Sequence, residues 1–154
     1  MKKILAITLI LIHIMGIFTI ASAAENKVVS LGANLSDKQR EQILDLFGVD
    51  ESEVEIIEVT NQEEREYLEG LISEDIIGKR AFSSAYVEIL DNDEGISVET
   101  HNITWVTKEM YANAMVTAGV KDARVIAAAP FDVSGTAALT GIMKAFEKAD
   151  RKST

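Results

Sequence analysis

The chain has 154 residues, 47% of them hydrophobic and 26% charged, a balance that is typical of one folded globular domain and excludes a disordered or fibrous chain. Its 25 acidic residues against 15 basic ones give a formal net charge of -10, so the chain lacks the cationic surface that nucleic acid requires. It contains no cysteine, which excludes disulfides, thiolate zinc sites and cysteine nucleophiles.

The first 23 residues have the pattern of a secretory signal peptide. Lys2 and Lys3 give a positive start, Ile4 to Ile20 is almost entirely apolar, and Ala21-Ser22-Ala23 is a triplet of small residues. We therefore expect cleavage after this triplet, a secreted or cell-envelope location, and no stable membrane span in the mature chain, 24–154. An uncleaved N-terminal anchor is the alternative, since the apolar run approaches the length of a membrane-spanning helix.

The first half of the mature chain predicts a strand, a helix and a second strand. Val28 to Ala33 alternates like a short strand. Ser36 and Gln39 have the spacing of a capping box, and Gly48 stands where a left-handed residue ends a helix. Val54 to Val59 is a β-branched run that favours a strand.

A second helix is expected to open at Asn61, with Glu64 as its capping partner. Its buried face would consist of Tyr67, Leu68, Leu71 and Ile72. The stretch from Asp50 to Asp75 holds eleven acidic residues and one basic residue. We interpret it as a solvated surface, with a weak calcium-responsive acidic module as the alternative, since calcium prefers clustered carboxylate oxygens.

The central part of the chain predicts a β-hairpin. Ala85 to Leu90 and Ile96 to Val106 read as strands, and the five residues between them, 91–95, suit a turn. The apolar alternation of the second strand changes phase near Thr100-His101-Asn102. We therefore expect a β-bulge with one extra residue there.

The last part predicts a helix, a strand and a helix. Thr107 and Gly119 bound the third helix, and Val125 to Ala129 reads as a strand that ends at Pro130. Ser134 is expected to start the fourth helix. A strand, helix and strand in succession predict a βαβ element with a right-handed crossover. The expected fold class is α+β: a single domain with a mixed sheet of about five strands and about four helices.

The turn Ser134-Gly135-Thr136 is the best candidate for a binding site. It joins the end of a strand to the start of a helix, where open α/β sheets usually bind ligands, and free backbone N–H groups there could hold a carboxylate or phosphate. The alternative is a helix cap without a ligand, since Asp132 adds a negative charge and no Lys or Arg lies in the turn.

His101, the sole imidazole of the mature chain, is the other candidate ligand-binding residue. A hydrolase would use His101 or the Ser134 turn, yet the chain has no G-x-S-x-G elbow, and a locally hydrogen-bonded strand histidine is the favoured interpretation. Trp105 with Tyr86 and Tyr111 could form a carbohydrate-stacking surface, although aromatics at such positions usually belong to the core. The pattern predicts no catalytic residue, no metal site and no cofactor.

Several segments resemble the exported bacterial proteins grouped as domain of unknown function family 1002. The resemblance rests on five runs: Val28 to Ser36, Ile57 to Asn61, Ser97 to Thr107, Ala129 to Phe131 and Ser134 to Ile142. It implies an exported envelope or extracellular protein with no established activity. It also implies that a C-terminal helical part is missing. The apolar face formed by Leu139, Ile142, Met143 and Phe146 would then lack a packing partner and favour self-association.

Together these observations predict an exported, non-enzymatic bacterial protein. Its partner would be a protein or a small-molecule ligand at the cell envelope, and not nucleic acid. A hydrolase and a calcium-responsive module are the two alternatives.

Overall fold

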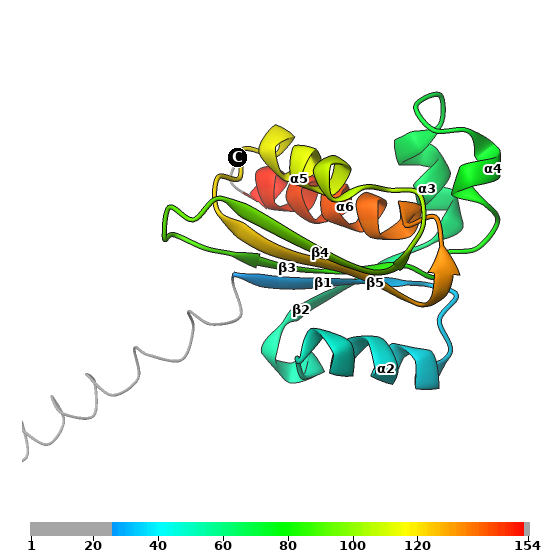
Figure 1. Ribbon diagram of the computed structural model, residues 1–154, viewed down its shortest axis with the longest axis horizontal. Helices are drawn as coiled ribbons and strands as arrows, with labels where there is room; N and C mark the ends of the chain where they lie inside the picture. Colours follow the sequence, from blue (N-terminus) through cyan, green and yellow to red (C-terminus); the bar gives the residue numbers. More distant parts are fainter. Residues whose placement is uncertain (1–25, 153–154) are drawn as a thin grey trace, which may run out of the picture.

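A computed structural model describes residues 26–152; the expected signal peptide, 1–23, lies outside them. A five-stranded sheet in the order β2-β1-β3-β5-β4 forms the centre (Figure 1). Four of its strands run in one direction and β3 runs against them, which confirms the expected mixed sheet. The strands are β1 (Lys27–Gly32), β2 (Glu55–Val59), β3 (Ser84–Ile89), β4 (Ile96–Ile103) and β5 (Ala123–Val133).

The expected α+β fold class is confirmed, and helices cover both faces of the mixed sheet. Figure 1 shows α2 on one face and α3, α5 and α6 on the other. Within residues 26–152 there is one α-helix more than expected, the four-residue α4. The helices are α2 (Asp37–Phe47), α3 (Asn61–Leu68), α4 (Glu74–Ile77), α5 (Lys108–Thr117) and α6 (Thr136–Lys152), with a 3-10 turn, η1 (Glu51–Glu53).

Each face of the sheet buries its own apolar cluster. On the α2 side, Ile43 and Phe47 pack against Val29 and Tyr86. On the other side, α3, α5 and α6 contribute a larger cluster that includes Leu68, Tyr111, Met115 and Ile142. Burying apolar surface on both faces is the main driving force for this layered arrangement.

The local signals that bound two of the helices are confirmed. Ser36 and Gln39 form the expected capping box at α2, and Gly48 follows the helix in the left-handed conformation with φ 69°. Thr107 caps α5 by accepting a hydrogen bond from the Met110 backbone N–H. These caps satisfy backbone groups that a helix end otherwise leaves unpaired.

Helix α3 begins at Asn61 as expected, but its expected capping pair and its expected end are wrong. Its capping box consists of Thr60 and Glu63, one residue before the expected pair. The helix ends at Leu68, because Gly70 adopts a positive φ of 79° and turns the chain away. Leu71 is therefore 78% exposed instead of buried on the helix face.

The expected β-hairpin has the right strands but lacks direct pairing. β3 and β4 are consecutive and antiparallel, yet β5 lies between them and pairs with both. The turn 91–95 therefore connects β3 to β4 across the end of β5, which lies between them. Alternating apolar residues show that a segment is a strand, but they do not show which strand lies beside it.

Two βαβ elements occur, β1-α2-β2 and β4-α5-β5, and in each the two strands are parallel neighbours. Both elements step in the same direction across the sheet. Their helices nevertheless pack on opposite faces (Figure 1), so the two crossovers have opposite hands. The expectation of a right-handed crossover thus fails in one of the two elements.

The irregularity expected near His101 is present, but the extra residues lie on the other strand. His101 pairs with Ala128, and Ile103 pairs with Val133. Between these two pairs β4 has a step of two residues and β5 a step of five. The extra residues therefore form an irregularity in β5, which continues as a strand past Pro130. Asn102 adopts a positive φ of 58° at this point, and its side chain donates a hydrogen bond to the Ala129 carbonyl.

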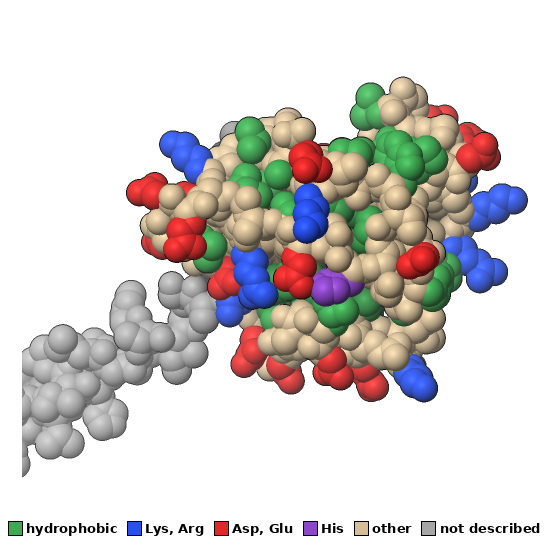
Figure 2. Space-filling view, in the orientation of Figure 1, with side chains coloured by type: hydrophobic (Ala, Val, Ile, Leu, Met, Phe, Trp, Pro, Cys, Tyr) green, Lys and Arg blue, Asp and Glu red, His purple; other side chains and the backbone are tan. Residues whose placement is uncertain are grey.

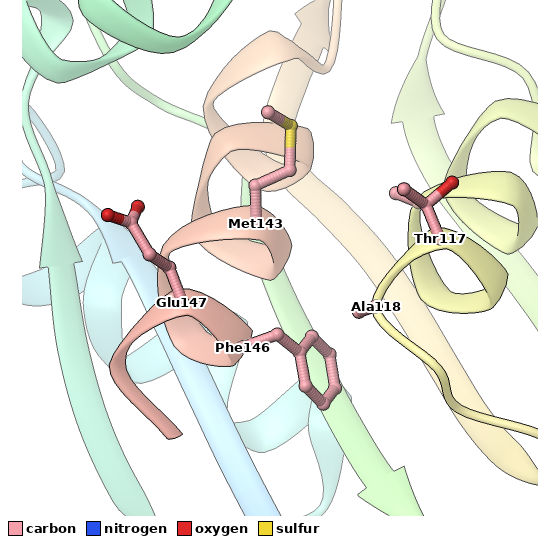
Figure 3. A pocket seen from close by; sticks show the side chains of 6 residues that line it. Thr117, Ala118, Met143, Phe146 and Glu147 are labelled. Carbon is pink, nitrogen blue, oxygen red and sulfur yellow. The ribbon is translucent and has the colours of Figure 1, made fainter. Parts of the chain in front are cut away.

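The apolar face proposed for self-association is largely covered within the fold. Leu139 and Ile142 are buried in the cluster between α6 and the sheet. Met143 and Phe146 are half-buried and line an open groove of about 400 Å3 between α5 and α6. Figure 3 shows the Phe146 ring directed toward Ala118 at the end of α5.

Candidate functional site

The Ser134 turn lies at the edge of the sheet where the four parallel strands end. Because β1, β2, β4 and β5 run in the same direction, their carboxyl ends all reach this edge. The turn follows β5 directly and leads into α6. This edge is the usual location of ligands in open α/β sheets.

Internal partners already occupy the hydroxyl groups of the turn that was expected to hold an anion. Helix α6 begins at Thr136, and the Ala138 N–H donates to the buried Ser83 hydroxyl at 2.8 Å. Ser134 Oγ lies 3.2 Å from Thr136 Oγ1, and Thr136 Oγ1 donates to Glu64 Oε1 at 2.7 Å. A carboxylate of the protein itself therefore lies beside the first residue of α6, where the helix dipole favours negative charge.

Gly135 gives the turn its shape. Its φ is 96°, and its carbonyl accepts a hydrogen bond from the buried Tyr111 hydroxyl at 2.8 Å. A Cβ atom at this position would lie 2.5 Å from both Ile103 Cγ2 and Tyr111 Oη. The site therefore requires glycine for space as well as for conformation.

Glu64 is the polar residue at this edge that sequence reasoning missed. Its side chain is only 1% exposed, and besides Thr136 it accepts a hydrogen bond from Asn61 Nδ2 at 2.9 Å. Burial raises the pKa of the Glu64 carboxyl, against the opposing effects of the Asn61 and Thr136 hydrogen bonds and the Arg65 charge. The available signal was its spacing of four residues from Leu68, which places both on the buried face of α3.

His101 lies apart from the Ser134 turn in its contacts. Its ring Nε2 is 2.6 Å from Glu99 Oε1 on the same strand, and its side chain is 39% exposed. Ile96 and Val98 pack against the α5–α6 side, so the alternation of β4 places Glu99 and His101 on the other face. The surface histidine is purple in Figure 2. Within the described part of the chain, no hydrogen bond joins His101 to Ser134.

The acidic stretch, Asp50 to Asp75, places most of its carboxylates on the surface, and the buried Glu64 is the exception. Asp50 accepts hydrogen bonds from both the backbone and the hydroxyl of Ser52, and these bonds lower the pKa of Asp50. Figure 2 shows acidic side chains along the side of the molecule where α2 lies. Among residues 26–152, no group of three or more histidine, aspartate or glutamate side chains is arranged to hold a metal ion.

A more distinctive surface lies next to the Ser134 turn. An open hollow of about 660 Å3 is lined by three aromatic rings from three separate segments. Trp105 is 40% exposed and Phe131 43% exposed, and the half-buried Phe82 ring packs edge-on against Phe131 with centroids 4.9 Å apart. We call this surface, formed by Phe82, Trp105 and Phe131, the aromatic hollow.

The aromatic trio suggested by the sequence is only partly right. Trp105 is on the surface, but Tyr86 and Tyr111 are buried in different clusters on opposite sides of the sheet. Burial raises the pKa of Tyr86 to about 12, with the neighbouring Glu88 adding to the effect. Both tyrosines therefore belong to the core, and the surface partners of Trp105 are phenylalanines.

Four charged side chains surround the aromatic hollow, two of each sign. They are Asp75, Lys79, Arg80 and Asp132, and all four are exposed. Within the described residues none of them forms an ion pair or a side-chain hydrogen bond. The hollow thus has hydrogen-bond donors, on Lys79 and Arg80, and hydrogen-bond acceptors, on Asp75 and Asp132, that are available to a ligand.

Backbone hydrogen bonds fix two of the segments that line the hollow to each other. The Thr104 N–H donates to the Val133 carbonyl at 2.8 Å, and the Val106 N–H donates to the Ser134 carbonyl at 2.9 Å. These bonds hold the loop after β4, which carries Trp105, against the end of β5. A surface held in this way loses little conformational entropy when it binds.

The third segment is held by side chains. The Gly78 carbonyl accepts hydrogen bonds from Asn61 Nδ2 at 3.2 Å and Arg65 Nη2 at 2.8 Å. The Ala81 N–H donates to Asn34 Oδ1 at 2.8 Å. Because Asn61 also binds Glu64, the buried carboxyl supports the wall of the aromatic hollow.

None of the helices within residues 26–152 has the length and apolar character of a membrane span.

Comparison with known proteins assigns the chain to a family. The chain is 46% identical over 151 residues to the uncharacterized protein YpuA of Bacillus subtilis (strain 168), a match that covers 96% of this chain and 52% of that protein. The chain thus spans about half the length of this relative. No solved structure matches it. A family model described as a protein of unknown function, DUF1002, matches residues 31–153, so the chain belongs to the DUF1002 family, as its sequence motifs predict.

Proposed function

We propose that this protein is an exported, non-enzymatic bacterial protein that binds a partner or ligand at the cell envelope through the aromatic hollow. The observation that carries the proposal is the hollow itself. A contiguous exposed apolar patch often marks a binding surface, and here aromatic rings converge from three segments beside four unpaired charged side chains.

The arrangement of the polar candidates supports a binding role over hydrolysis. Ser134 bonds to Thr136, and His101 bonds to Glu99 on the opposite face of the sheet. A serine nucleophile needs a base within hydrogen-bond reach. Neither residue supplies the other with that partner.

Export is supported by the pattern of residues 1–23. The full chain, expressed in Bacillus subtilis, should appear in the medium or on the cell surface with Ala24 as its first residue. Mass spectrometry of that product reads the cleavage site. A chain that keeps Met1 or stays in the cytosol would contradict export.

Binding can be tested with the exported product and isolated Bacillus subtilis envelopes. We expect the wild type to sediment with the envelopes. Trp105→Ala and Phe131→Ala should each reduce the bound fraction at least about tenfold, because each removes a large contact surface. Leu71→Ala is the matched control, since Leu71 is an exposed apolar residue outside the hollow.

Melting curves of the three variants must overlap with that of the wild type, so that loss of binding reports the surface and not the fold. Absence of envelope binding by the wild type, or equal binding by all variants, would overturn the proposed site.

A further inference from the structure

We propose that the ligand of the aromatic hollow is an uncharged carbohydrate chain; this inference rests on the proposed function and deepens it. The aromatic rings are the first reason. The C–H groups on one face of a pyranose ring form an apolar surface that packs on an aromatic ring, and Trp105 and Phe131 offer partly exposed rings at the surface.

The charged groups around the rings are the second reason. A sugar hydroxyl both donates and accepts hydrogen bonds, so it can use Asp75 and Asp132 as acceptors and Lys79 and Arg80 as donors. An anionic ligand would meet the two carboxylates, and a cationic ligand would meet the two cations. A neutral polyhydroxylated ligand can gain from all four without a repulsive contact.

The shape of the site and the charge of the whole chain also favour an uncharged carbohydrate. Peptide partners are usually anchored by side chains that enter enclosed pockets, whereas this hollow is open. The net charge of -10 repels acidic polymers over a longer range. An uncharged glycan avoids that repulsion and fits a shallow surface.

Trp105 provides a direct signal, because it is the only tryptophan in the chain. Polysaccharide released from Bacillus subtilis envelopes can be separated by anion exchange into neutral and acidic fractions. We expect the neutral fraction to produce a saturable change in tryptophan fluorescence, and Phe131→Ala to weaken it at least about tenfold. Leu71→Ala should leave the titration unchanged.

Chemical treatment of the envelopes separates this inference from the proposed function. Periodate, which cleaves vicinal diols of sugars, should abolish sedimentation of the wild type with envelopes, and protease treatment should leave it intact. Binding that survives periodate and is lost with protease would overturn the carbohydrate assignment while the proposed function stands. Preferential binding of the acidic fraction would also overturn it, and failure of untreated envelopes to bind would overturn both.

Discussion

At the scale of single residues, Glu64 shows how a charge is used inside this domain. The side chain is buried, and its two carboxylate oxygens accept hydrogen bonds from α6 and from its own helix, through Thr136 and Asn61. A buried carboxylate without such partners would cost several kcal/mol, roughly. The hydrogen bonds therefore make the burial tolerable, and in return the carboxyl links α3 to the start of α6.

The raised pKa of Glu64 predicts a pH dependence of stability. Its pKa in the folded state lies above the ordinary value of 4.5, mainly because of burial. The contribution of Glu64 to the free energy of unfolding is therefore fully present below the pKa of the unfolded state. It is lost as the pH rises through the pKa of the folded state. In urea unfolding at a series of pH values, the free energy of unfolding of the wild type relative to Glu64→Gln should fall as the pH rises above 4.5.

The neighbouring Glu63 is the control for that measurement. Burial acts to raise its pKa, but hydrogen bonds from Lys144 and Thr60 and the Lys144 charge outweigh it, so the pKa of Glu63 is lowered. Its stabilising contribution is lost as the pH falls through the folded pKa. The free energy of unfolding of the wild type relative to Glu63→Gln should therefore fall as the pH is lowered, which is the opposite of the trend expected for Glu64→Gln. A flat profile for Glu64→Gln relative to wild type would contradict the burial argument.

Gly135 gives a second prediction at this scale. Gly135→Ala places a methyl group against Ile103 and Tyr111 and forces a residue with a side chain to keep φ at 96°, so we expect a loss of about 3 kcal/mol in the free energy of unfolding. Gly119 also has a positive φ, but nothing lies within 4 Å of its missing Cβ. Gly119→Ala should cost only about 1 kcal/mol. Equal losses in urea titrations would show that Gly135 is not needed for space.

At the scale of elements, local signals identified the helices and strands but not their neighbours. Ser36 and Gly48 bound α2 because capping depends on residues within one turn. The place of β5 between β3 and β4 depends instead on partners far apart in sequence, such as Ser84 and Ala128. Alternation within one strand contains no information about that pairing.

In the candidate site, too, local sequence signals predicted some features, and contacts between distant segments determined the others. The Ser134 turn could be placed at the end of a strand from local patterns alone. The convergence of Trp105, Phe131 and Phe82 could not, because it depends on strand order and on the three extra residues of β5. Exposure of an aromatic ring is decided by that packing and not by its immediate sequence.

The contact between α6 and β1 yields a prediction for a pair of elements. A Cβ on Gly141 would lie 2.1 Å from Ser30 Oγ and 2.4 Å from Ser30 Cβ, so the helix approaches the strand through a glycine. Gly141→Ala should lower the free energy of unfolding by about 2 kcal/mol, although alanine favours the helix itself. The same change in a Ser30→Gly background should be nearly neutral.

A double-mutant cycle by urea unfolding measures this coupling. We expect an interaction free energy of about 1–3 kcal/mol between the two positions. Ser30→Gly alone also loses the hydrogen bond from the Ala85 N–H to Ser30 Oγ, and the cycle removes that cost from the comparison. Additive effects would show that the close approach does not constrain the packing of α6.

At the scale of the whole molecule, the strand order gathers the candidate site residues of the Ser134 turn and the aromatic hollow at one edge of the sheet. Four strands end there, and the loops that follow carry the Ser134 turn and Trp105. Acidic side chains line the side of the molecule where α2 lies and also occur on its other sides (Figure 2), with Asp75 and Asp132 at the hollow itself. At the aromatic hollow the two carboxylates are balanced by Lys79 and Arg80, so this edge does not share the negative net charge of the whole chain.

The net charge of -10 predicts how ions affect the stability of the whole molecule. Repulsion among exposed carboxylates opposes the compact state, and salt screens it. Raising NaCl from about 0.02 M to about 0.3 M should raise Tm by about 2–5 °C. Because residues 26–152 contain no arranged group of metal ligands, CaCl2 at the same ionic strength should raise Tm by the same amount. Calorimetry in the two salts makes the comparison, and a clearly larger shift with calcium would favour the calcium-responsive module instead.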